Sequence, residues 1–192
     1  MRYVWQPAAV AAMPLESLTY RRCGPAEAAL LRAVAISCYT PYYRDLWEPG
    51  GMEEYLNSLY EPVLLASELG DPNLRFEIAY RRDEPVGFSK YHLRCDRADT
   101  PNAGYLERVY VAPSVSGAGV GRRLIERMIA TARDDRRDWI WLQVMSHAAK
   151  PIERYKALGF AEYAQVRLAL PRVRQAHAGM VVMRLNLRSS NS

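Results

Sequence analysis

The segment VAPSVSGAGVGRRL, residues 111–124, joins a predicted strand that stops at Pro113 to a predicted helix that begins near Gly121. It has glycines at positions 117, 119 and 121, separated by single residues. Free backbone N–H groups at the start of a helix lie at the positive end of the helix dipole and bind anionic oxygens. One glycine at positive φ would suffice for a plain turn. The three glycines therefore predict a cradle in which a ligand approaches the backbone closely.

Two arginines follow these glycines and support the same prediction. Arg122 and Arg123 fall in the first helical turn, where each cation is unfavourable by roughly 0.3 to 1 kcal/mol. A bound anion would reverse that penalty. The common nucleotide patterns do not fit, because the dinucleotide fingerprint needs its third glycine one position later and the P-loop needs Lys and Ser or Thr after its last glycine.

Length and composition indicate one globular domain. The chain has 192 residues, of which 49% are hydrophobic and 24% charged, and this length is too short for two ordinary domains. We predict an N-terminal arm over 1–16, a single domain over 17–188 and a C-terminal tail over 189–192. No apolar run is long enough to cross a membrane. The three cysteines are scattered, which indicates neither a disulfide framework nor a metal site and favours a cytoplasmic setting.

The net charge of +5 does not by itself indicate nucleic-acid binding. The arginines are dispersed, and no predicted helix has a continuous basic face with interleaved aromatic residues. A small polyanionic ligand explains the excess equally well. Residues 44–61 hold five acids and one arginine, whereas residues 167–188 hold five arginines and no acid. The two ends of one site are therefore expected to prefer ligands of opposite sign.

The order of the predicted elements indicates an α/β fold with a mixed sheet. Strands are expected at 18–22, 75–82, 86–94, 104–113, 139–145, 161–170 and 179–187, and helices at 24–39, 52–69 with a break at Pro62, 121–133 and 151–158. Hairpins come first and strand–helix alternation follows, which predicts helices on both faces of the sheet. The segment 40–51 is expected to be an aromatic loop.

Two motifs resemble the GNAT superfamily of acyl-CoA dependent N-acetyltransferases. LERVYVAPSVSGAGVGRRLIERM, residues 106–128, matches the family's pyrophosphate turn, and WLQVMSHAAKPIERYKALGFAEY, residues 141–163, matches its later Y-x-x-x-G-F segment. The resemblance implies a mostly antiparallel sheet of about seven strands, splayed at two parallel central strands, with the pantetheine arm of acetyl-CoA in the opening. The aromatic segment 38–56 further resembles the bacterial spermine/spermidine acetyltransferase branch.

The resemblance also assigns the cofactor-binding residues. Two positions depart from the family pattern: Ser116 replaces the usual Gln or Arg of the turn, and Ala148 replaces the usual Asn of the later motif. Backbone amides, with Arg122 or Arg123, would then have to hold the pyrophosphate, and weaker cofactor affinity is one consequence. The expected cofactor-binding residues are Val109, Tyr110, Val111, Ser116, Gly117, Ala118, Gly119, Val120, Gly121, Arg122 and Ala148.

Direct acetyl transfer needs a neutral amine, a polarised carbonyl and an acid for the departing thiolate. By the resemblance, Tyr155 lies beside the cofactor sulfur as the acid, and the N–H groups of 109–111 polarise the carbonyl. Glu107 is the first choice of base, but a strand glutamate paired with Arg108 is an equal alternative. His147 is a second candidate, and an ordinary polar contact is its alternative role.

The acceptor pocket is expected in the aromatic segment. Tyr42, Tyr43 and Trp47, with Tyr39, would pack around an alkylamine, and Asp45 or Glu48 would attract its charge. The alternative is that these aromatic residues bury an irregular loop and the acids only solvate it.

The leading function is acetyl transfer from acetyl-CoA to a primary amine of a small molecule, such as a polyamine. Acetylation of a protein or peptide is an alternative, which predicts an open groove, and a catalytically weak CoA-binding regulatory protein is another. No nucleic-acid or membrane partner is expected. Edge pairing by the final strand, 179–187, would give a homodimer, although this strand equally completes the sheet.

Overall fold

The structure, a computed structural model, describes residues 18–188. The predicted arm over 1–16 and the predicted tail over 189–192 lie outside the described residues. The strands are β1 Leu18–Arg22, β2 Leu74–Arg81, β3 Glu84–His92, β4 Ala103–Val111, β5 Trp139–Met145, β6 Ala161–Arg167 and β7 Gly179–Asn186. The α-helices are α1 Ala28–Tyr43, α2 Gly51–Leu59, α3 Pro62–Gly70, α4 Val120–Asp134 and α5 Ala149–Lys156.

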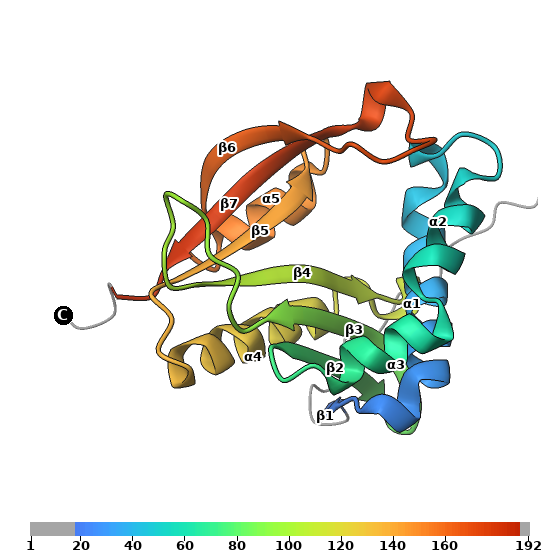
Figure 1. Cartoon of the computed structure of the whole chain (residues 1–192), viewed down its shortest axis with the longest axis horizontal. Coiled ribbons are helices and arrows are strands. Elements are labelled where there is room, and N and C mark those ends of the chain that lie inside the picture. The colour runs from blue at the N-terminus through green and yellow to red at the C-terminus, as the bar shows by residue number, and fades with distance from the viewer. Residues whose placement is uncertain (1–17, 189–192) are drawn as a thin grey trace, which may run out of the picture.

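The strands form one mixed, mostly antiparallel sheet, as predicted. Its order is β1-β2-β3-β4-β5-β7-β6, and β4 and β5 are parallel. These two strands pair only where Ala103–Leu106 lies beside Trp139–Leu142, and beyond these residues they diverge (Figure 1). The predicted opening between two parallel central strands is therefore confirmed.

A β-bulge shapes β4 at this opening. Lys90 of β3 pairs with Arg108 while Tyr91 pairs with Leu106, so Glu107 is an extra residue in β4. Bulges re-aim side chains and are common next to active sites. Glu107 and Arg108 are adjacent in sequence, yet both line the same cavity.

Helices cover both faces of the sheet. On one face, α1 and α3 pack over β2 and β3 around a core that includes Phe76, Ile78 and Phe88. On the other face lies α4, whose predicted apolar stripe is buried: Leu124, Ile125, Met128, Ile129 and Ala132. Each fully buried aliphatic side chain contributes roughly 1.5–3 kcal/mol to folding. The two cores therefore stabilise the sheet on both of its faces.

The segment 168–178 between β6 and β7, which we call the strap, reaches across the opening to the end of α1 (Figure 1). Val173 forms a β-bridge with Trp47, and the Arg174 side chain donates a hydrogen bond of 2.9 Å from Nε to the Trp47 carbonyl. The Glu48 N–H donates to the Arg172 carbonyl, also at 2.9 Å. Backbone and side-chain bonds together therefore fix the strap to residues 47–48.

One sequence prediction differs from the structure, and another, which left two alternatives open, is decided by it. The helix predicted to stop at Tyr39 continues to Tyr43 with Pro41 inside it. Pro41 lies in the last turn, where it removes one hydrogen bond, and the rings of Tyr39 and Tyr43 stack 4.4 Å apart on one helix face. The final strand, β7, is not an edge strand, because it lies between β5 and β6. It therefore completes the sheet and offers no free edge for a dimer.

Candidate active site

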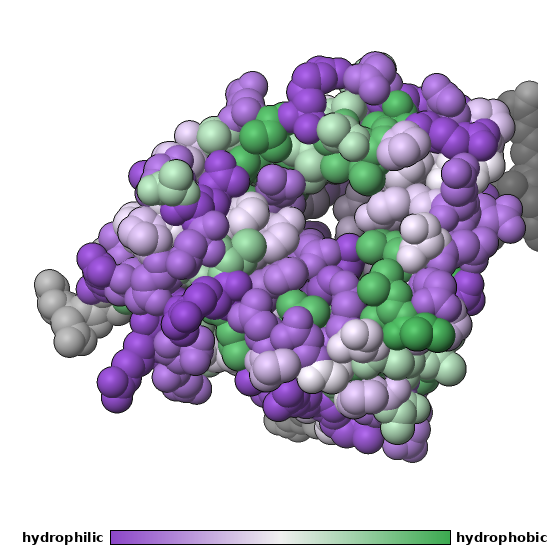
Figure 2. Space-filling model, viewed as in Figure 1, coloured by the Kyte–Doolittle hydropathy of each residue, from purple (hydrophilic) through white to green (hydrophobic). Residues whose placement is uncertain are grey.

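Two cavities flank the opening between β4 and β5. The larger, of about 680 Å³, is lined by the end of α1, by β4, by β5 and by the strap, and we call it the aromatic cavity. The smaller, of about 330 Å³, lies between the glycine turn, α4 and α5, and we call it the glycine-turn cavity. Both are lined by Val109 and Val111 of β4 and by Tyr155 of α5. Figure 2 shows the molecule hollowed near the centre of this face, between the strap and β4.

The glycines of the turn have two different roles. Gly117 and Gly119 have φ of +88° and +83°, a region in which other residues are strained, so the turn itself requires them. Gly121 does not have a positive φ, and a Cβ there would lie 3.7 Å from Val111, which is ordinary contact. The protein therefore does not itself require a glycine at position 121, and its bare backbone leaves room in the glycine-turn cavity.

The start of α4 has the donors expected of an anion cradle. The Arg123 N–H donates to the Gly119 carbonyl at 3.0 Å, whereas the N–H groups of the first helical residues point out of the helix end. Arg122 and Arg123 also pair with Glu126, at 2.7 Å and 3.2 Å. This pairing offsets part of the unfavourable helix-dipole interaction of both arginines without a bound anion.

The predicted cofactor residues divide between the two cavities. The glycine-turn cavity is lined by Val109, Val111, Gly117, Gly119, Val120, Gly121 and Arg122. The aromatic cavity is lined by Val109, Tyr110, Val111, Ser116 and Ala148. Ala118 is exposed and lines neither of these two cavities. One side of the opening, at the glycine turn, therefore exposes mainly backbone, and the other side, next to the strap, exposes mainly side chains.

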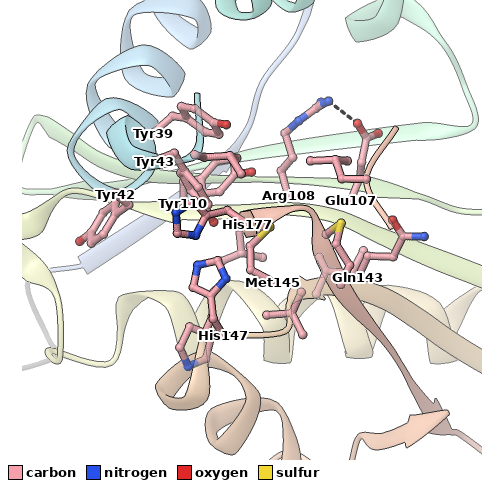
Figure 3. Close-up of a pocket in the computed structure, with 18 of the residues that line it drawn as sticks. Tyr39, Tyr42, Tyr43, Glu107, Arg108, Tyr110, Gln143, Met145, His147 and His177 are labelled. Carbon is pink, nitrogen blue, oxygen red and sulfur yellow. Dashed lines mark ion pairs between the residues drawn. The ribbon is translucent and has the colours of Figure 1, made fainter. Parts of the chain in front are cut away.

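The predicted acceptor residues Tyr42, Tyr43 and Trp47 all line the aromatic cavity. Figure 3 shows the first two of them. Trp47 is buried and donates from Nε1 to the Tyr39 hydroxyl at 3.1 Å. Tyr43 lies edge-on to Tyr110 at 5.7 Å between ring centroids, so a ring from α1 meets a ring from β4. Of the two candidate acids, Asp45 lines the cavity and Glu48 does not.

Tyr155 lies where the two cavities meet. It is in α5, which begins at Ala149, and its ring packs edge-on against Phe160 at 5.7 Å between centroids. Burial raises the pKa of Tyr155 well above its ordinary value of 10.0. The hydroxyl is therefore protonated at neutral pH and can donate to a group in the opening.

Glu107 lies in a network of ion pairs, which is the alternative that the sequence leaves open. Its carboxylate pairs with Arg108, with Lys90 at 3.0 Å and with His92 at 2.6 Å (Figure 3 shows the Arg108 pair). Burial opposes its ionisation, but the hydrogen bond with His92 and the charges of Arg108 and Lys90 outweigh burial and lower the pKa of Glu107 to about 2. Such a carboxylate accepts protons poorly at neutral pH.

His147 lies in the turn after β5 and faces His177 of the strap, with 5.4 Å between ring centroids (Figure 3). Sequence reasoning did not single out His177, because only the folded strap brings it to the cavity. It also missed Gln143 and Arg154, which line the opening. Gln143 could have been found from the sequence, because it is a polar residue within the apolar strand WIWLQVM. Arg154 could have been found because it is next to Tyr155.

Within residues 18–188, no group of three or more His, Cys, Asp or Glu side chains is arranged to hold a metal ion. Over the same residues, no helix is long and apolar enough to cross a membrane.

Solved structures of other proteins share this fold. The PaiA N-acetyltransferase of Thermoplasma acidophilum, in complex with coenzyme A, has a TM-score of 0.71 at 16% identity, covering 88% of this chain and 99% of that chain. YncA of Salmonella typhimurium, with acetyl-CoA, has a TM-score of 0.62 at 20% identity, covering 92% and 97%. At these identities the likeness establishes the fold alone.

Sequence comparison establishes the family. An IAA acetyltransferase of Azospirillum brasilense is 30% identical over 116 residues, which are 58% of this chain and 72% of that protein. A model of the acetyltransferase (GNAT) family matches residues 33–160, a span that includes the opening, the glycine turn and Tyr155. This match covers more than half of the chain, and the chain therefore belongs to the GNAT family of acetyltransferases.

Proposed function

We propose that the chain transfers the acetyl group of acetyl-CoA directly to a primary amine of a small molecule. One observation carries the proposal: the two cavities, one with a bare backbone and one with aromatic walls, meet at Tyr155 in the opening of the sheet. A cofactor in one cavity and an amine in the other would then share one reacting point. Holding two reactants in this way supplies much of the rate enhancement of a transfer reaction.

The glycine turn suits the pyrophosphate of coenzyme A. Gly117 has no protein atom within 4 Å of a Cβ position, and at Gly121 a Cβ would meet only Val111 at 3.7 Å and Val109 at 4.0 Å, which is ordinary contact. The N–H groups of the first turn of α4 and the arginines at 122 and 123 would hold the anionic oxygens. Acetyl-CoA supplies an activated thioester, and Val109–Val111, where β4 has left β5, would direct backbone N–H groups at its carbonyl.

The transfer step makes a bond between the amine nitrogen and the acetyl carbon and breaks the carbon–sulfur bond. The amine loses one proton and the departing thiolate gains one. We assign the proton that the thiolate gains to the hydroxyl of Tyr155, which burial keeps protonated. We assign the proton of the amine to the His147 side of the cavity, because the pKa of Glu107, lowered to about 2, makes this carboxylate a weak proton acceptor.

A small acceptor is favoured over a protein because of the strap. The strap is bonded to residues 47–48 and forms one wall of the aromatic cavity, where it would obstruct a protein acceptor, which needs an open groove. A solved structure with the same fold is a ribosomal-protein-S18-alanine N-acetyltransferase of Escherichia coli, at 16% identity, so the fold alone does not decide between these acceptors. The resemblance to the spermine/spermidine branch makes a polyamine one acceptor to test, with Asp45 as the acid that would attract it.

The test is release of free thiol from acetyl-CoA with a panel of polyamines, amino acids, other small amines and lysine peptides. We expect a small amine to accelerate release and a peptide to do so poorly. Tight binding of acetyl-CoA with no acceptor above background would instead indicate a CoA-binding regulatory protein.

Replacing Tyr155 by Phe checks the assigned acid. We expect kcat to fall about 100-fold, within the usual range for a lost general acid, while KM for acetyl-CoA stays the same. Tyr163→Phe is the matched control, because this tyrosine lies on β6, is bonded to Asp99 and does not line either cavity. An unchanged kcat in Tyr155→Phe would remove this hydroxyl from the mechanism.

A further inference from the structure

Arg108 is a buried cation on the wall of the aromatic cavity. Its side chain is 9% exposed, and it lines the cavity next to the bulge in β4 (Figure 3). Among the described residues, its ion-pair partner is Oε1 of Glu107, and its guanidinium lies 5.8 Å from the ring centroid of Tyr60. A guanidinium has five N–H donors. One carboxylate oxygen and one ring leave several of these donors for a group inside the cavity.

Glu107 shares its charge among several partners. Its Oε2 lies 3.0 Å from Lys90 Nζ and 2.6 Å from His92 Nε2, so Arg108 is left with the other oxygen. Lys90 also pairs with Glu68 at 2.7 Å. The cations Arg108 and Lys90 alone match the two carboxylates of Glu68 and Glu107, so this cluster has no surplus negative charge with which to attract an ammonium group.

The rest of the cavity wall is balanced as well. Its other charged lining residues within the described chain are Asp45 and Arg154, besides the two histidines of the strap side. A polyamine carries at least two positive charges, and a selective pocket for it would need excess acid. A molecule that carries one carboxylate beside its amine matches a balanced wall that contains a donor-rich arginine.

We infer that the acceptor is an amino acid-like molecule whose carboxylate is bound by Arg108 while its amine faces the opening beside Tyr155. This inference rests on the proposed function and narrows its substrate class. A planar carboxylate accepts two parallel hydrogen bonds from a guanidinium, which fixes both its position and its orientation. The aromatic rings of Tyr39, Tyr43 and Tyr110 would pack against the apolar part of such an acceptor.

The first experiment uses the unaltered protein and matched acceptors. Thiol release is measured with amino acids, with their primary amides, with the corresponding decarboxylated amines, with an aminosulfonate and with spermidine. We expect kcat/KM for the free acid to exceed that for its amide by about 10- to 100-fold, as for a lost charged hydrogen bond. The aminosulfonate arm separates a planar carboxylate from a tetrahedral oxyanion.

The second experiment changes the arginine. Arg108→Gln and Arg108→Lys should remove most of the preference for the acid, and the rate with the amide should change much less. The Lys variant keeps the charge beside Glu107, so it tests the bidentate contact even if the Gln variant folds poorly. Arg44→Gln, an exposed arginine at the end of α1 outside the cavity lining, is the control.

Three results would overturn the inference while leaving the proposed function intact. The first is an equal kcat/KM for an amino acid and its amide, and the second is spermidine as the best acceptor. The third is an equal loss of kcat/KM with the amino acid and with its amide in both Arg108 variants. Acetylation of no amine at all would overturn both proposals. A clear preference for the free acid that disappears in Arg108→Lys supports the carboxylate site.

Discussion

At the scale of residues, the chemistry of a side chain at the opening depends on its ion-pair partners as well as on the kind of amino acid. Glu107 lies in a strand, lines the cavity and would be a natural base in an isolated strand. The bulge places it against Arg108, and Lys90 and His92 hold its second oxygen. A sequence reader sees the glutamate and the arginine next to each other but cannot see the two partners from β3. The contacts that make Glu107 a weak base also allow its carboxylate to stabilise the folded state.

The low pKa of Glu107 predicts how stability depends on pH. The folded-state pKa of about 2 lies below the unfolded value of about 4.5, so this stabilisation is complete above pH 4.5 and is lost as the pH falls toward 2. The difference corresponds to about 3 kcal/mol of unfolding free energy. Glu107→Gln should therefore be less stable at pH 7 by about this amount, and should lose less on acidification from pH 5 to pH 3.

Urea unfolding of both proteins at pH 7, 5 and 3 measures this difference. Glu53→Gln, an exposed change on α2, is the control and should follow the unaltered protein. If Glu107→Gln loses as much stability as the unaltered protein between pH 5 and pH 3, the ion network is not the source of the acid sensitivity.

At the scale of elements, most of the helices, strands and motifs that could be predicted were predicted from patterns within short stretches of sequence. The stripe on α4, the hairpin of β2 and β3 and the motifs at the glycine turn and at Tyr155 are short-range signals, and the structure confirms the elements in which they lie. The continuation of α1 through Pro41 was missed, because stacking of Tyr39 on Tyr43 is a packing effect. The strap and its His177 were missed because they depend on contacts between residues more than a hundred positions apart.

The different roles of the glycines in the turn predict different effects of the same substitution. Gly119→Ala places a side chain at φ +83° and should lower stability by about 1 kcal/mol or more. Gly121→Ala meets only ordinary contact at 3.7 Å, and alanine is preferred over glycine in helices by up to about 1 kcal/mol. Gly121→Ala should therefore keep or raise Tm without ligand, and it should raise KM for acetyl-CoA.

Thermal unfolding without ligand and steady-state kinetics on both variants separate the two effects. If Gly121→Ala leaves KM for acetyl-CoA unchanged, the bare backbone at the start of α4 is not where the cofactor approaches. If Gly119→Ala is as stable as the unaltered protein, the turn tolerates a side chain in the left-handed region.

At the scale of the whole molecule, the opening is also the weakest junction of the sheet. Only four residue pairs join β4 to β5, whereas the neighbouring antiparallel pairs on both sides are longer. The strap adds a second connection between the part that contains β5 to β7 and the part that contains α1. A ligand wedged between β4 and β5 would add contacts across this junction, in addition to its binding at the glycine turn.

Acetyl-CoA should therefore raise the unfolding temperature clearly. At a concentration 100 times its Kd, a ligand that binds only the folded state stabilises it by about 2.7 kcal/mol, which for a chain of this length corresponds to a Tm increase of about 5 to 10 °C. S-acetylpantetheine, which has the thioester and the pantetheine arm but no pyrophosphate, should give a much smaller shift at equal concentration. Differential scanning fluorimetry with both ligands, on the unaltered protein and on Gly121→Ala, measures the contribution of the turn. Equal shifts from both ligands would mean that the glycine turn does not bind the pyrophosphate, and Gly117 and Gly119, with their positive φ, would then serve only the geometry of the turn.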